Sequence, residues 1–167
     1  YAPGLGYYSA GSTKLGAAGD FVTAPEISAA LGRAFALTID AELAALRADT
    51  VLEVGAGTGV LAAQLLDAFA ALGRNVRYLI LERSADLRAR QQEVLAGYAG
   101  RVRWLDELPR EPIVAVVVAN EVLDALPVTC FVKMADDARA VGVRRDGGGF
   151  AWSEPVADAG VAAAVAA

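Results

Sequence analysis

Residues 51–59 read Val-Leu-Glu-Val-Gly-Ala-Gly-Thr-Gly, and this stretch decides the fold class of the chain. The β-branched and apolar run Thr50–Gly55 leads into alternating glycines and then into a helical pattern with Leu61 and Leu65 on one side. In open α/β sheets, ligands bind where a strand passes into a helix. Glycine lets the backbone turn tightly there and approach a ligand without interference from a Cβ atom. We therefore predict a ligand site at this junction.

The spacing of the glycines indicates which ligand binds. A dinucleotide fingerprint requires G-x-G-x-x-G, and the position of its last glycine is Val60 here, which disfavours a nicotinamide oxidoreductase. No Gly-Lys-Ser/Thr follows, so a P-loop is excluded. The carboxylate of Glu53 would repel a pyrophosphate, whereas it suits the amino group and sulfonium of S-adenosylmethionine (SAM). The loop predicts a SAM site, and the simpler alternative is a tight turn without a ligand.

Two acidic residues follow the next expected strands. Glu82 ends the second strand, where a carboxylate can accept hydrogen bonds from both ribose hydroxyls. Asp106 follows Trp104 and Leu105, and we expect it to hold the adenine ring and its exocyclic amine. The alternatives are a surface carboxylate for Glu82 and an ordinary loop residue for Asp106.

The wider pattern predicts an α/β fold, a doubly wound Rossmann-like parallel sheet. Apolar strands at Val76–Leu81, Arg101–Leu105 and Ile113–Ala119 alternate with amphipathic helices, one of them capped by Ser84. The first helix should begin at the capping box of Thr23 and Glu26. Its buried face should carry six apolar residues, namely Ile27, Leu31, Phe35, Ile39, Leu43 and Leu46.

After Pro127 the pattern changes to antiparallel strands. These are expected at Val128–Met134, Ala140–Arg145 and Gly149–Ser153, with a turn at 146–148 between the last two. We expect three segments, namely a Gly/aromatic arm (1–22), the SAM-binding core (23–127) and a β-hairpin insertion with the start of a helix (128–167).

Composition limits the classes of function. A chain of 167 residues that is 56% hydrophobic fits one globular domain or somewhat less, and a net charge of -5 disfavours nucleic acid as a partner. Histidine is absent, which excludes Ser-His and Cys-His nucleophiles and His-bearing metal sites, and no metal site is expected. The lone Cys130 favours a reducing compartment, and we expect the cytoplasm. No apolar run suggests a membrane span.

Two longer motifs resemble the MidA-like family of class I SAM-dependent methyltransferases. They are Gly19–Ser28 upstream of the glycine loop and Asn120–Pro127 after the fourth strand, and together with Tyr7-Tyr8 they extend the resemblance over most of residues 4–155. Mitochondrial members methylate an arginine of a core subunit of respiratory complex I during its assembly. The resemblance implies a protein-arginine methyltransferase, acting in the mitochondrial matrix if the chain is eukaryotic. It leaves open the acceptor protein and whether the chain forms a homo-oligomer.

The resemblance also implies roles for individual residues. Asn120 and Glu121 would lie near the transferable methyl group, and Glu82 would hold the ribose. The glycine-loop residues would cradle SAM, and three upstream residues would close the pocket. The residues that would cradle SAM are Glu53, Gly55, Ala56, Gly57 and Gly59. The residues that would close the pocket are Gly19, Asp20 and Thr23.

A guanidinium acceptor needs carboxylates that pair with it and help to remove a proton. Glu121 and Asp124 lie three residues apart and could share one face of a helical turn, so they are our catalytic candidates together with Asn120, and Glu26 is a further one. Simpler roles are also open. Asn120 could cap a helix, Glu121 and Asp124 could favour its dipole, and Glu26 could serve only its capping box.

Members of the resembled family continue past the hairpin into further strands. We therefore expect this chain to be the cofactor-binding part of a longer enzyme, with its sheet truncated after the fourth strand. A nucleic-acid methyltransferase is disfavoured, because Asn120–Leu123 reads Asn-Glu-Val-Leu and not an Asn-Pro-Pro-aromatic run. The main alternative is a non-catalytic SAM-fold assembly factor that binds a partner protein.

Overall fold

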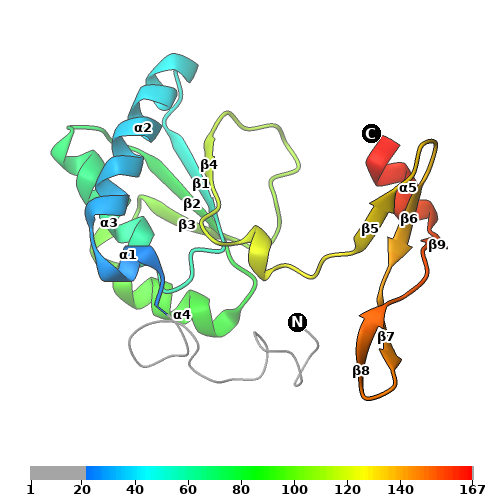
Figure 1. Cartoon of the computed structure of the whole chain (residues 1–167). Coiled ribbons are helices and arrows are strands. Elements are labelled where there is room, and N and C mark those ends of the chain that lie inside the picture. Colours follow the sequence, from blue (N-terminus) through cyan, green and yellow to red (C-terminus); the bar gives the residue numbers. More distant parts are fainter. Residues whose placement is uncertain (1–21, 167) are drawn as a thin grey trace. The chain divides into compact units, whose positions relative to one another are not determined.

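The computed structural model describes residues 22–166, which fall into two compact units that divide between Ala125 and Leu126 (Figure 1). No helix among these residues is both long and apolar enough to cross a membrane. The first unit contains, in chain order, α1 (Ala24–Ile27), α2 (Ala30–Leu46), β1 (Thr50–Val54), α3 (Val60–Ala71), β2 (Arg77–Leu81), α4 (Ala85–Val94), the 3-10 turn η2 (Ala96–Tyr98), β3 (Val102–Leu105), β4 (Val116–Val118) and the 3-10 turn η3 (Leu123–Ala125).

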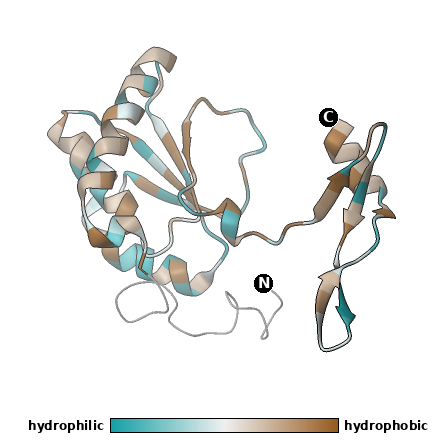
Figure 2. Cartoon of the chain, viewed as in Figure 1, coloured by the Kyte–Doolittle hydropathy of each residue, from teal (hydrophilic) through white to brown (hydrophobic). Residues whose placement is uncertain are grey.

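The first unit is built on a parallel four-stranded sheet in the order β3-β2-β1-β4. Val51 of β1 pairs with Tyr78 of β2 and with Val116 of β4, so these side chains share one face, and it is this face that forms the hydrophobic core. Figure 2 shows β4 in the brown of the most hydrophobic residues. Its Val117 lies on the opposite face and is 60% exposed. The prediction of an α/β, Rossmann-like parallel sheet is confirmed.

Two predicted elements of this unit differ from the structure. The helix expected to begin at Thr23 is two helices, because Ser28 takes an extended conformation that ends α1, and its hydroxyl accepts from the N–H of Ala30 at the start of α2. Ile27 is consequently 75% exposed. The buried residues of α2 are Gly32, Ala36, Ile39 and Leu43. Of the expected face, Ile39 and Leu43 are buried and Leu31 and Phe35 are half-buried, whereas Leu46 is 49% exposed. The fourth strand is also shorter than the expected Ile113–Ala119.

The second unit is antiparallel and contains β5 (Cys130–Lys133), β6 (Ala138–Val141), β7 (Val143–Asp146), β8 (Gly149–Trp152), β9 (Val156–Ala157) and α5 (Ala159–Ala166). Strands β5, β6 and β9 form one sheet, and β7 pairs with β8. The strand predicted at Ala140–Arg145 is split at Gly142, whose N–H donates to the Ser153 hydroxyl at 2.9 Å. The hairpin turn is confirmed, since Asp146 pairs with Gly149 across Gly147, which has a φ of 57°.

Candidate functional site

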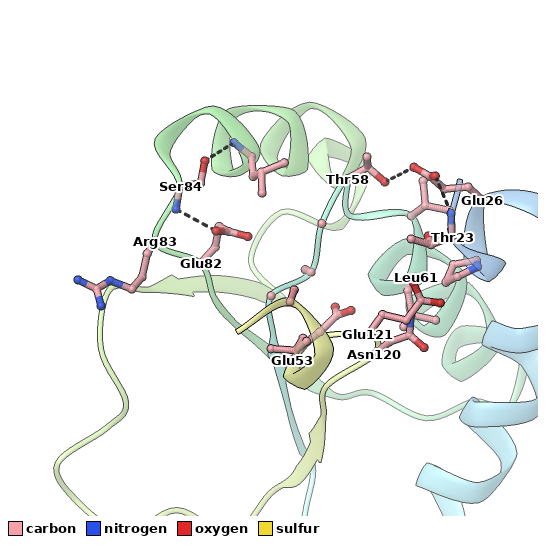
Figure 3. A pocket seen from close by; sticks show the side chains of 18 of the residues that line it. Thr23, Glu26, Glu53, Thr58, Leu61, Glu82, Arg83, Ser84, Asn120 and Glu121 are labelled. Carbon is pink, nitrogen blue, oxygen red and sulfur yellow. Dashed lines mark hydrogen bonds between the residues drawn. The ribbon is translucent and has the colours of Figure 1, made fainter. Parts of the chain in front are cut away.

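A cavity of about 480 Å³ opens at the carboxyl ends of β1, β2 and β4 (Figure 3). This is the edge of a parallel sheet at which ligands are expected to bind. All of its lining residues belong to the first unit. They come from the start of α1, the end of β1, the glycine loop, the segment from the end of β2 into α4 and the segment after β4. Those used below are Thr23, Glu26, Glu53, Gly55, Ala56, Gly57, Thr58, Glu82, Asn120, Glu121 and Ala125.

The glycine loop needs its glycines for two reasons. Gly55, Gly57 and Gly59 have φ angles of 66°, 55° and 87°, a left-handed conformation that side chains with a Cβ atom rarely adopt. Gly55 is also crowded, because a Cβ atom there would lie 3.1 Å from Val122. Gly55, Ala56 and Gly57 line the cavity, whereas Gly59 is not among the lining residues and faces Gln91 of α4. The predicted loop is therefore built to bring backbone atoms to the cavity wall.

Glu26 fastens the start of α1 to this loop. One of its carboxylate oxygens accepts from the Thr58 hydroxyl at 3.1 Å, and the other accepts from the backbone N–H of Thr23 at 3.3 Å. The second bond is the Glu26 half of the predicted capping box. These two bonds make Glu26 a structural link between the start of α1 and the glycine loop. Thr23 itself lines the cavity.

Glu53 is a buried carboxylate at the cavity wall. Its side chain, 2% exposed, accepts a 2.8 Å hydrogen bond from the Tyr78 hydroxyl. The pKa of Glu53 is raised to about 7, chiefly because the carboxylate is buried; the Tyr78 hydrogen bond opposes this rise and the nearby charge of Glu82 adds to it. The pKa of Tyr78 is raised well above its usual value, chiefly because the ring is buried. A cationic ligand group beside Glu53 would favour its ionised form.

Glu82 is held by a donor on each carboxylate oxygen. The N–H of Ser84 donates to Oε1 at 2.9 Å, and the Gln91 amide donates to Oε2 at 3.0 Å. Ser84 also caps α4, as predicted, by accepting from the N–H of Leu87. Each Glu82 oxygen keeps a lone pair for a further donor, so the carboxylate can still accept from two hydroxyls of a ligand.

Asn120 and Glu121 reach the cavity directly after β4, but Asp124 does not line it. Glu121 has a left-handed φ of 53°, and the 3-10 turn begins after it, with the Val122 carbonyl accepting from the N–H of Ala125. Glu121 and Asp124 therefore do not share the face of one helical turn, as the three-residue spacing suggested. The 3-10 turn begins only at Leu123, so Asn120 lies too far upstream to be its N-cap residue. Ala125 lines the cavity, whereas Asp124 does not.

The structure does not bring Asp106 to the cavity. Its side chain is 87% exposed and forms an ion pair with Arg88 at 2.6 Å. Arg88 also donates to the carbonyls of Glu82 and Leu105, so it ties together the ends of β2 and β3. Gly19 and Asp20 lie outside the described residues.

Sequence reasoning missed two residues that support the site, Tyr78 and Gln91. Tyr78 reads simply as a strand residue, and only the register of β1 against β2 brings its hydroxyl to Glu53. Gln91 does carry a signal, because it is a polar residue on the apolar side of α4. It is fully buried and hydrogen-bonded to Gly57, Glu82 and Trp104.

Five acidic residues thus line one cavity that has a glycine-rich backbone wall, namely Glu26, Glu53, Glu82, Asp86 and Glu121. Figure 3 shows Glu53, Glu82 and Glu121 around it. Such a site favours a ligand that carries positive charge and hydroxyl groups, and it opposes a phosphate.

Comparisons with known proteins agree with this geometry. A family model described as "Putative S-adenosyl-L-methionine-dependent methyltransferase" (Methyltransf_28) matches residues 30–166. The chain is similar to a COG1565 superfamily member from Burkholderia thailandensis that was crystallised bound to S-adenosyl-homocysteine, with 47% identity, a TM-score of 0.78, and coverage of 99% of this chain and 46% of that one.

A native structure of a COG1565 superfamily protein from the same organism is 46% identical, with a TM-score of 0.72 and coverage of 99% of this chain and 44% of that one. The chain therefore spans about half the length of these solved structures. The comparison with curated proteins found no match.

Proposed function

The chain belongs to the Methyltransf_28 family, and from this premise we propose that its cavity binds SAM and serves methyl transfer to an acceptor. The observation that carries the proposal is the meeting of Glu53, the glycine loop and Glu82 around a single cavity. The similar Burkholderia thailandensis protein was crystallised with S-adenosyl-homocysteine, the product form of this cofactor. A COG1565 relative of this kind supports the same ligand class here.

The residues present fit this cofactor. Gly55 and Gly57 have left-handed φ angles and present backbone without a Cβ atom at the cavity wall. Glu82 would accept from the ribose hydroxyls, and Glu53 would face the positive charge of the ligand. When bound, the cofactor supplies an electrophilic methyl group on a sulfonium.

The work left to this chain is to position an acceptor and exclude water. We propose that Asn120 and Glu121 hold the acceptor, since both line the cavity and Glu121 is exposed to an incoming group. If the acceptor is an arginine guanidinium, the Glu121 carboxylate would pair with its positive charge and assist loss of a proton from the attacking nitrogen. A protein-arginine acceptor, including a respiratory complex I subunit, follows from the MidA-like resemblance and is part of the proposal. Location in the cytoplasm, which the lone Cys130 favours, stays a prediction.

Calorimetry tests the cofactor. The chain should bind SAM in the micromolar range, and Gly57→Val should abolish binding, because valine is strained at this φ and the change adds a branched side chain to a residue that lines the cavity. Gly73→Val is the matched control, since Gly73 has a similar φ of 69° with no atom near its missing Cβ. Equal binding by wild type and Gly57→Val, or binding by neither, would contradict a SAM site in this cavity.

Methyl transfer needs a second experiment, with labelled SAM and a cell extract. Label on a protein band that is lost in Glu121→Gln and kept in Asp124→Asn would support catalysis at Glu121, because Asp124 is exposed and does not line the cavity. Binding of SAM without any transfer would favour the alternative, a non-catalytic assembly factor.

A further inference from the structure

Gln91 is the most highly connected side chain behind the cavity. It is fully buried in α4 and does not line the cavity. Its Nε2 donates to the carbonyl of Gly57 at 2.9 Å and to Glu82 Oε2 at 3.0 Å. Its Oε1 accepts from the Trp104 indole N–H at 2.9 Å. One amide thus connects three parts of the fold, namely the glycine loop, Glu82 directly after β2, and Trp104 in β3.

These partners allow only one orientation of the amide. Both amide hydrogens meet acceptors, and the amide oxygen meets a donor that has no accepting capacity. A flipped amide would place its oxygen against the Gly57 carbonyl and the Glu82 carboxylate, and its NH₂ group against the Trp104 N–H. Three repulsive contacts would replace three hydrogen bonds, so the orientation is fixed by the chemistry of the neighbours.

Gly59 explains how Gln91 comes so close to the loop. A Cβ atom at Gly59 would lie 3.3 Å from both Cα and Cγ of Gln91, tighter than an ordinary contact. The last glycine of the loop does not face the cavity, so its lack of a side chain serves the approach of α4. Glycine at position 59 therefore leaves room for Gln91, although Gly59 does not line the cavity.

We propose that Gln91 is a positioning residue of this site, which fixes the Glu82 carboxylate relative to the glycine loop so that it reads both ribose hydroxyls of the ligand. The proposal rests on the SAM site proposed above. Without the Gln91 donor, one oxygen of the largely buried Glu82 loses its internal partner and the carboxylate is held only through Ser84. The contribution of the ribose hydroxyls to the binding free energy should then fall more than the contributions of other parts of the ligand.

The test measures the affinity of the whole chain for S-adenosyl-homocysteine and for its analogue without the ribose 2′- and 3′-hydroxyls. Hydrogen bonds to a charged group contribute enough that wild type should prefer the natural ligand by about 10- to 100-fold. In Gln91→Met, which keeps the volume and removes all three hydrogen bonds, the preference should fall to about 3-fold or less. Gln92→Met makes the same change at an exposed position of α4 and should behave as wild type.

The ratio of the two affinities separates positioning from folding, because a general loss of structure weakens both ligands alike. Gln91→Glu provides a second variant, because the new carboxylate would face the Glu82 carboxylate. The affinity ratio should therefore fall at pH 8. Protonation of the new carboxylate at lower pH should restore part of the ratio. A wild-type ratio in Gln91→Met, or equal losses for both ligands, would overturn the proposal. So would a wild type that binds both ligands equally, whereas a wild type that binds neither would overturn the SAM site itself.

Discussion

Glu53 is a carboxylate that folding transfers from water into the wall of a cavity. Its pKa rises from the ordinary 4.5 to about 7, mainly through burial, so the folded chain holds this proton more tightly than the unfolded chain. Stability falls with rising pH wherever the folded state binds more protons. The free energy of unfolding should therefore decline between pH 4.5 and 7 because of Glu53 and stay at the lower level above pH 7.

Glu53→Gln should remove this decline. The glutamine oxygen can still accept from Tyr78. The variant should be nearest to wild type at the acidic end of this range and should exceed its free energy of unfolding above pH 7 by up to about 3 kcal/mol. Denaturant unfolding at pH 5, 6, 7 and 8 measures the difference, with Asp124→Asn as an exposed control. Parallel pH curves for Glu53→Gln and wild type would contradict the prediction.

Individual site residues were predictable where local sequence fixes their place. Glu53, Glu82, Gly55 and Gly57 follow from strands passing into helices, and the structure brings these four to one cavity. Tyr78 and Gln91 could not be assigned roles, because their partners lie 25 and 9 or more residues away and depend on strand register and helix packing. Asp106 was expected to hold the adenine, but its carboxylate instead forms an ion pair with Arg88.

At the scale of elements, the α/β alternation was readable from apolar strands between amphipathic helices. What could not be read was the break after α1, which depends on the conformation of a single residue, Ser28. The burial of Gly32 and Ala36 beside the expected apolar face of α2 has a tertiary cause. Gly32 lets α2 pack closely on Gln64 of α3, whose amide donates to the Pro25 carbonyl at 2.7 Å.

Gly32→Ala should therefore destabilise the chain although alanine favours helices. The new Cβ would lie 2.5 Å from Cβ of Gln64, so the two helices must separate, and we expect a net loss of about 1–3 kcal/mol. Thermal unfolding measures the loss. Gly97→Ala is the control, since no atom lies near its missing Cβ, and it should be close to neutral. Unchanged stability in Gly32→Ala would show that Gln64 can move aside.

At the scale of the whole molecule, the described chain divides into two compact units, and the cavity belongs to one of them. The change of pattern after Pro127 predicted antiparallel strands there, and these are present. The split of the strand at Gly142 was not readable, because it depends on paired hydrogen bonds to Ser153.

Proteolysis between the units should leave the ligand site intact. Residues 126–129 are exposed and carry no helix or strand, so a protease of broad specificity should cut there early. The nicked chain should bind S-adenosyl-homocysteine within about 3-fold of the intact chain, since that factor is well under 1 kcal/mol. Calorimetry before and after cleavage measures this, and loss of binding on cleavage would show that the second unit contributes to the site.

With the acceptor-binding role proposed for Glu121, its left-handed backbone would place stability and function in conflict at a single position. A residue with a side chain gives up roughly 1 kcal/mol in that conformation, which glycine would recover. A library randomised at this position and selected only for resistance to heat should therefore drift toward glycine or asparagine. Selection for methyl transfer should draw it back to glutamate, so the two enriched populations would separate what the turn prefers from what the reaction requires.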